Sequence, residues 1–72
     1  MKMPTMVPVK SSNLQAVGYS NHGLFVRFAG GGLYSYPGAP KSIYDEIVQA
    51  ESPGGAFREK VHSKYPHLKH DA

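Results

Sequence analysis

The sequence predicts an α+β domain: a three- to four-stranded antiparallel β-meander followed by two short helices packed on one face of the sheet. Two observations indicate this fold. Apolar residues alternate with a period of two between residues 14 and 36, and from residue 41 onward they recur three and four positions apart. A chain of 72 residues forms one domain with a small core. We expect that core to span residues 7–65 and residues 66–72 to be a frayed tail.

The alternating segments predict three strands, at residues 14–19, 24–28 and 33–36. A further edge strand is expected before them, at residues 6–9. Leu24, Val26 and Phe28 occupy every second position and therefore share one face of the sheet. Residues 20–23 and the glycine triplet at 30–32 are expected to form tight turns, because Asn and Gly tolerate a left-handed backbone. The strands therefore pair in sequence order.

The second half of the chain has helical spacing, and two helices are expected at residues 41–50 and 55–64. Ile43 and Ile47 lie one turn apart on the same face of the first helix. Ser52 is suited to cap the second helix, with Pro53 at its first position. Pro66 ends this helix, because proline cannot continue the hydrogen-bond pattern. The two amphipathic helices are available to cover one face of the sheet.

Composition places the chain among small folded proteins of a reducing compartment. It has no cysteine, which excludes disulfides and thiolate metal sites. Hydrophobic residues make up 40% and charged residues 18%, which is typical of a folded domain. No apolar run approaches the roughly 18 residues that a membrane span needs. Residues 1–10 lack the apolar core of a signal peptide, and we expect a cytoplasmic protein.

Charge is distributed unevenly along the chain. Residues 1–44 contain four basic side chains and no acidic one, whereas residues 45–72 contain four basic and five acidic side chains. A carboxylate-free first half favours anionic ligands such as phosphates, because nothing in it repels them. The alternative is that the net charge of +3 serves only solubility.

The first candidate site lies on the predicted sheet. Tyr34 and Tyr36 are two positions apart on one strand, so they point to the same face. Aromatic side chains on a sheet can stack nucleobases, and Arg27 on the neighbouring strand could contact a phosphate. The alternative is that the tyrosines pack beneath the helices, with their hydroxyl groups hydrogen-bonded at the rim of the core.

Small polar residues form a second candidate group for phosphate binding. In the first half of the chain this group consists of Lys10, Ser11 and Ser12, which we expect beside the tyrosines. Ser52 with Gly54 and Gly55 offers a hydroxyl group and backbone N–H groups at a helix start, which can bind anions. The alternative for Ser52 is simple helix capping, and for Ser11 and Ser12 it is a turn before the first main strand.

Catalysis, cofactors and a native metal are not expected. Asp45 and Glu46 are adjacent in a helix and do not face each other, and the chain lacks a thiol nucleophile. The spacing of His62, His67 and His70 matches no standard zinc site. The basic run toward the C-terminus is interpreted as a solvated helix face and is formed by Arg58, Lys60, His62, Lys64, His67, Lys69 and His70.

Several short motifs occur in a characteristic order along residues 7–65: Val9-x-Ser11-Ser12-x-Leu14, Gly18-Tyr19, Leu24-x-Val26-x-Phe28, Tyr34-x-Tyr36, and Ala50-x-Ser52-x-Gly54 followed by Phe57. This pattern resembles the KTSC domain, a family named for the C-terminus of some lysyl-tRNA synthetases and also found in stand-alone bacterial and phage proteins. Ala56, where the family often has an aromatic residue, and the glycine triplet, where it tends to have a shorter polar turn, depart from the pattern. The resemblance implies the fold and a bacterial or phage-infected host cell, and it suggests RNA binding.

The sequence leaves three functions open. The leading hypothesis is a non-catalytic module that binds phosphate-bearing ligands, either RNA or a nucleotide. The second is a homo-oligomeric protein that sequesters a small nucleotide immune signal, such as a cyclic nucleotide or an ADP-ribose derivative, as phage proteins of this size do. The third is a protein–protein interaction module. We expect self-association, because a core this small leaves open surface to cover.

Overall fold

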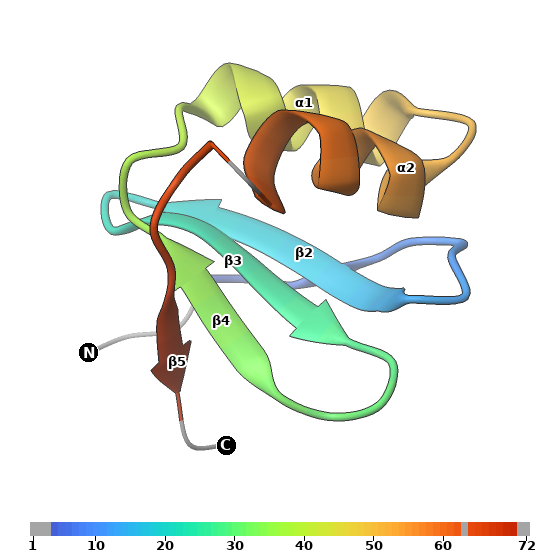
Figure 1. Cartoon of the computed structure of the whole chain (residues 1–72), viewed down its shortest axis with the longest axis horizontal. Helices are drawn as coiled ribbons and strands as arrows, with labels where there is room; N and C mark the ends of the chain where they lie inside the picture. Colours follow the sequence, from blue (N-terminus) through green and yellow to red (C-terminus); the bar gives the residue numbers. More distant parts are fainter. Residues whose placement is uncertain (1–3, 63, 71–72) are drawn as a thin grey trace.

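A computed structural model of the chain describes residues 4–62 and 64–70. Five antiparallel strands form one meander in sequence order, and the helices cover one face of the sheet (Figure 1). The predicted α+β class is confirmed, with the edge strand present and one strand more than predicted. The strands are β1 (Val7–Pro8), β2 (Leu14–Ser20), β3 (Gly23–Phe28), β4 (Leu33–Tyr36) and β5 (Leu68–His70).

The β2–β3 hairpin depends on a glycine at the start of β3. Gly23 has a φ of 102°, which side-chain-bearing residues rarely adopt. A Cβ atom there would lie 2.5 Å from the carbonyl oxygen of Tyr36 on β4. The register shifts between Leu14 and Ala16, so that Leu14 pairs with Phe28 and a β-bulge forms near the end of the hairpin.

The helical half comprises α1 (Lys41–Gln49), α2 (Pro53–Phe57) and a π-helical turn, η1 (Arg58–His62). The oxygen Oγ of Ser52 accepts a 3.3 Å hydrogen bond from the N–H of Gly55, as expected of a cap. The second helix therefore begins before the predicted residue 55. No helix within residues 4–62 and 64–70 has the length and apolar character to cross a membrane.

The core lies between the helices and one face of the sheet. Val17 and Val26 pair on β2 and β3, and both are fully buried under the helices. Ile47 of α1 and Val61 of η1 pack onto them and are also fully buried. The face predicted for Leu24, Val26 and Phe28 is therefore the helix-covered face. The amphipathic pattern of both halves is explained by this single interface.

The opposite face of the sheet, called the far face below, is closed by the ends of the chain. The ring of His70 stacks on that of Phe25 with centroids 5.7 Å apart, and Phe25 is fully buried. His70 Nε2 and the Oγ of buried Ser35 share a 2.7 Å hydrogen bond. Near β1, a Cβ atom on Gly18 would lie 2.8 Å from Met6 Sδ, so the N-terminal segment crosses close above that position.

Strand β5 corrects the expectation that residues 66–72 form a frayed tail. Residues 68–70 pair with β4, bringing His70 opposite Leu33 and Leu68 opposite Ser35. Three residues are too few to show a period in the sequence, and the contacts that hold them are tertiary. Residues 71–72 lie outside the described part of the chain.

Candidate functional site

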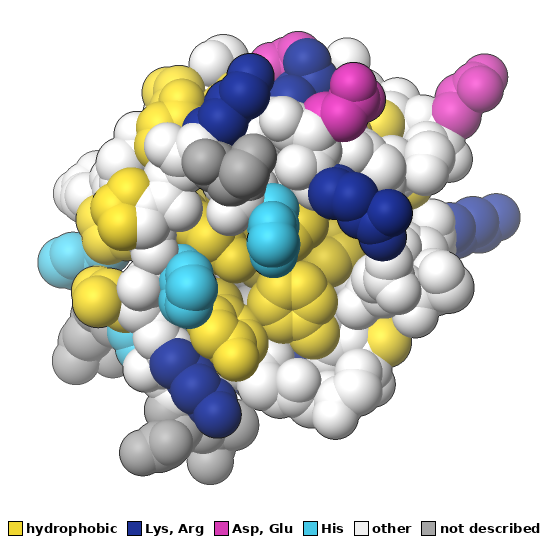
Figure 2. Space-filling model, in the orientation of Figure 1, with side chains coloured by type: hydrophobic (Ala, Val, Ile, Leu, Met, Phe, Trp, Pro, Cys, Tyr) yellow, Lys and Arg dark blue, Asp and Glu magenta, His cyan; other side chains and the backbone are white. Residues whose placement is uncertain are grey.

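An open groove lies between α2–η1 and the strands β3 and β4. We call it the aromatic groove and define it by Asn13, Phe28, Tyr34, Tyr36, Phe57, Arg58, His62 and His67. It consists of two adjoining hollows of about 350 and 440 Å³, which share Phe28 and His62. Each hollow has the size of a small-ligand pocket. Figure 2 shows hydrophobic side chains gathered here below the helices, with histidines against them.

The floor of the aromatic groove is a cluster of rings packed edge to face. The ring centroid of Phe28 lies 5.3 Å from that of Tyr34 at 83°, and 5.6 Å from that of Phe57 at 76°. Tyr36 meets Phe57 in the same way at 5.5 Å. Phe28 and Tyr34 are only half-buried, whereas Phe57 and Tyr36 belong to the core. Exposed ring surface is therefore held in place by buried neighbours.

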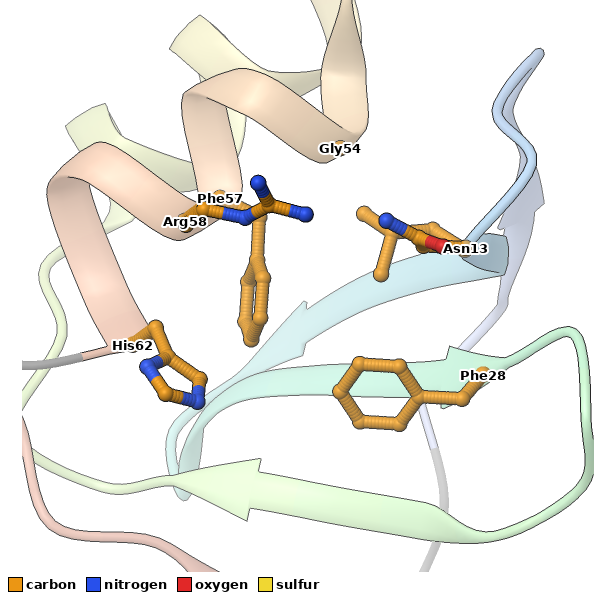
Figure 3. A pocket seen from close by; sticks show the side chains of 7 residues that line it. Asn13, Phe28, Gly54, Phe57, Arg58 and His62 are labelled. Atoms are coloured by element: carbon orange, nitrogen blue, oxygen red, sulfur yellow. The ribbon is translucent and has the colours of Figure 1, made fainter.

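Basic side chains border this floor. In Figure 3 the guanidinium group of Arg58 extends over the first hollow toward Asn13, and the ring of His62 lies beside Phe57. His67 packs edge-on against Tyr34, with centroids 5.3 Å apart. No Asp or Glu lines either hollow among the described residues. The groove therefore combines aromatic surface with cationic and neutral donors.

A third hollow of about 380 Å³ adjoins the first and shares Asn13, Gly54 and Arg58 with it. It contains the predicted polar group, with one carboxylate beside it, and its other lining residues are Lys10, Ser11, Ser12, Glu51, Ser52 and Gly55. The structure thus places the predicted phosphate neighbours at the Arg58 end of the groove. It does not place them beside the tyrosines, whose hollow they do not line.

Two of the three serine hydroxyl groups in this third hollow, those of Ser11 and Ser52, have structural partners. Ser11 Oγ accepts hydrogen bonds from the N–H groups of Asn13 at 3.1 Å and Leu14 at 3.2 Å, which forms the turn before β2. A Cβ atom on Gly54 would lie 2.7 Å from that same Oγ. Gly54 is therefore needed for α2 to approach this turn. The Ser11 and Ser52 hydroxyl oxygens thus fix the turn and the helix start that border the groove. Their hydroxyl protons can still be donated to a hydrogen-bond acceptor.

The two tyrosines share the helix-covered face as predicted, but their environments differ. Tyr36 pairs with Leu24, lies in the core and is 3% exposed, so the core alternative holds for it. Burial, and secondarily the proximity of Tyr34, raise the pKa of Tyr36 above the ordinary tyrosine value. Tyr34 is half-buried and presents its ring to the groove.

Arg27 does not join the tyrosines. It pairs with Leu33 on β4 and with Ala16 on β2, so its side chain points to the far face. The predicted grouping of Arg27 with Tyr34 and Tyr36 is therefore not formed. Arg27 is on the strand next to Tyr34, as predicted. However, Val26 is the residue opposite Tyr34, so the side chain of Arg27, one position further on, points to the other face of the sheet.

Lys69 on β5, and not Arg27, is the basic residue on the same sheet face as Tyr34. It pairs with Tyr34, so its side chain is on the same face as that ring. His67 reaches Tyr34 from the segment just before β5. Both residues belong to the basic run of the C-terminal segment, but their approach to Tyr34 depends on β5, a strand too short to show periodicity. Arg58 and His62 belong to the same run, and their side of the helix borders the groove as well as solvent, which corrects the interpretation of the run as a solvated face alone.

The histidines do not converge on one point. His62 and His67 line the groove, whereas His70 is on the far face with Ser35. Among the described residues, no three His, Asp or Glu side chains lie close enough together to hold a metal ion. The arrangement is suited to binding through ring surfaces and basic groups.

These features define a small α+β domain with an aromatic groove on its helix-covered face. The sequence profile of the KTSC domain matches residues 10–65, and the chain belongs to this family. A protein from Tsukamurella paurometabola is 41% identical over 51 residues, which cover 68% of this chain and 76% of that protein. The crystal structure of a KTSC domain protein from Yersinia pestis is similar, with a TM-score of 0.87 at 27% identity, covering 96% of this chain and 100% of the other.

Proposed function

We propose that the aromatic groove binds a phosphate-bearing ligand with a nucleobase, either RNA or a nucleotide, without catalysing a reaction. One observation carries the proposal: half-exposed rings and basic side chains line a groove that contains no carboxylate among the described residues. A nucleobase stacks on an aromatic ring whatever its identity, and an arginine fork matches a phosphate. The ligand, like the protein, would be found in the cytoplasm.

In this proposal each part of the groove has its own role. Phe28 and Tyr34 supply the accessible ring surface for stacking. Arg58 supplies the phosphate contact, since it is exposed and lies over the first hollow. The ion pairs found within residues 4–62 and 64–70 are Lys41–Asp45 and Lys60–Glu46, so neither engages Arg58. Its guanidinium group is available to a ligand.

The shape of the groove bears on the second hypothesis, sequestration of a small nucleotide signal. Sequestration requires an enclosed pocket, which the open groove of one chain does not provide. A second copy placed over the groove would be needed to enclose such a ligand. Native mass spectrometry of protein purified from cells distinguishes the two, because sequestration predicts a homo-oligomer carrying a nucleotide of defined mass.

The test is a comparison of the chain's two arginines. We expect Arg58→Gln to weaken binding of a fluorescent single-stranded RNA in an anisotropy titration by roughly two- to fivefold, the range for an exposed ionic contact. Arg27→Gln removes the same charge from the far face and should leave the affinity unchanged. Thermal melts of both variants check that each remains folded.

Three results would contradict the proposal. Equal losses for the two variants would show that only net charge matters. Retention of full affinity by Arg58→Gln would show that the groove is not the site. If no RNA or nucleotide binds the wild type, the interaction-module hypothesis takes precedence, and a peptide ligand for the groove becomes the next candidate.

A further inference from the structure

The groove has cationic side chains at both of its ends. Arg58 stands at the end that adjoins the third hollow, where Lys10 is also found. Lys69, on the edge strand β5, does not line the second hollow but lies beside it, opposite the lining residue Tyr34. The rings that line both hollows, Phe28 and His62, lie between these ends. Figure 2 shows Lys and Arg side chains on opposite sides of the hydrophobic patch.

We infer that the groove binds a single-stranded nucleic acid of at least two nucleotides, with one phosphate at Arg58, another at Lys69 and the bases on the rings between them. This inference rests on the proposed function and names its ligand. A mononucleotide has phosphate on one side of its base only and would leave one cationic end unused. A chain with successive phosphates uses both.

The groove favours single strands over duplexes. Its ring surfaces lie below the helices, at the bottom of hollows whose walls are side chains of α2 and η1. Bases in a duplex are stacked on each other and cannot reach such a floor, whereas unpaired bases can turn out onto aromatic rings. Tracking of the backbone by cations beside stacked bases is the general mode of single-strand binding.

Strand β5 would then be part of the binding site as well as of the fold. It holds Lys69 opposite Tyr34, and the segment before it holds His67 against the same ring. Both residues lie beyond residue 65, where the match to the family profile ends. The second phosphate contact therefore lies in the C-terminal segment, outside the residues that the profile matches.

The test is a length series of 5′-phosphorylated oligouridylates, namely the mononucleotide, the dinucleotide and the tetranucleotide, titrated calorimetrically at low salt. We expect the tetranucleotide to bind at least fivefold more tightly than the mononucleotide, since one more base stack corresponds to roughly 5- to 150-fold in affinity. A matching deoxyoligonucleotide series shows whether the 2′-hydroxyl groups contribute.

The variant that isolates the inference is Lys69→Gln. We expect a roughly two- to fivefold loss for the tetranucleotide, no loss for the mononucleotide, and a salt slope flatter by about 0.7. Lys69→Arg should retain the affinity. Lys41→Gln is the control for loss of one positive charge, because this lysine lies on α1, where it pairs with Asp45, and not on the strand that pairs with Tyr34.

The outcomes separate this inference from the proposed function. If the mononucleotide binds and Arg58→Gln weakens it, but affinity does not rise with length, the two-ended ligand is wrong and the groove proposal stands. Equal losses for Lys69→Gln and Lys41→Gln also overturn the inference. If no nucleotide of any length binds, both proposals fail together.

Discussion

On the helix-covered face of the sheet, α2 and η1 leave the rings of Phe28 and Tyr34 half-exposed at the floor of a groove. On the far face, Phe25 of the same strand as Phe28 is fully buried, with the His70 ring stacked on it. Both faces are built from the same strands, one residue out of phase. Aromatic content alone therefore does not indicate a binding surface; what covers each ring decides whether a ligand can reach it.

The difference extends to the charged residues. Arg58 and Lys69 stand on the groove side, whereas Arg27 lies with Leu33 on the far face. A ligand on the groove meets the first two and cannot meet the third. Because of this contrast, we expect substitutions on the far face to change stability and substitutions on the groove face to change binding.

The largest effect is expected for Phe25→Ala on the far face. Removing a fully buried phenylalanine ring costs roughly 3–5 kcal/mol, a large part of the roughly 4–11 kcal/mol expected for a domain of this length. Urea unfolding followed by circular dichroism measures the loss. Val48→Ala on α1, where the side chain is 37% exposed, is the control and should change stability little. A loss below about 1 kcal/mol for Phe25→Ala would show that this face is not packed as described.

The next largest effect concerns binding through the groove. Phe28→Leu keeps an apolar side chain but removes the stacking ring, and should reduce the free energy of RNA binding by about 1–3 kcal/mol. Phe28→Tyr keeps the ring and should bind like the wild type. Anisotropy titration measures both, after thermal melts of each variant. Equal affinities for the leucine and tyrosine variants would remove Phe28 from the site.

The helix-covered face could largely be predicted from sequence. Period-two alternation placed Leu24, Val26 and Phe28 on one face and Tyr34 with Tyr36 on one side of its strand, and the structure confirms both. Those patterns depend only on local geometry, because successive side chains of a strand point to opposite sides.

The composition of the groove depends on information that is not local. Strand register sets which residue of β3 lies opposite Tyr34, and this residue is Val26 rather than Arg27. Lys69 lies on the groove face, and His67 lines the groove, only because β5 pairs with β4. The contacts of His70 with Phe25 and Ser35 hold β5 in this position. A three-residue strand has no periodicity from which to predict such pairing.

A smaller effect is expected where α2 meets the turn before β2. A Cβ on Gly54 would lie 2.7 Å from Ser11 Oγ, which two backbone N–H groups hold in place. Gly54→Ala should therefore cost about 1–2 kcal/mol of stability. In a Ser11→Ala background the same change should become neutral or stabilising, because the contact is gone and alanine favours helix over glycine by up to about 1 kcal/mol. Urea unfolding of the four proteins gives this comparison, and additive effects would contradict it.

The smallest effect is a pH dependence. Burial raises the pKa of Tyr36, so the folded state keeps this proton at a pH where the unfolded chain has lost it. The stabilisation is present below the unfolded-state pKa of about 10 and is lost as the pH rises through the folded-state value. Tyr36→Phe should therefore lose stability less steeply than the wild type above about pH 10. Melting temperatures between about pH 8 and pH 11 measure the two slopes, and equal slopes would contradict the burial of this hydroxyl group.

The chain's two arginines offer the most direct test of the central claim, that the groove face and not the far face binds the ligand. Their side-chain Nε–H groups give two signals in a proton–nitrogen correlation spectrum, assigned by the loss of one signal in Arg27→Gln and of the other in Arg58→Gln. Titration with a single-stranded tetranucleotide should shift the Arg58 signal and leave that of Arg27 in place. A shift of the Arg27 signal, with Arg58 unchanged, would contradict the account.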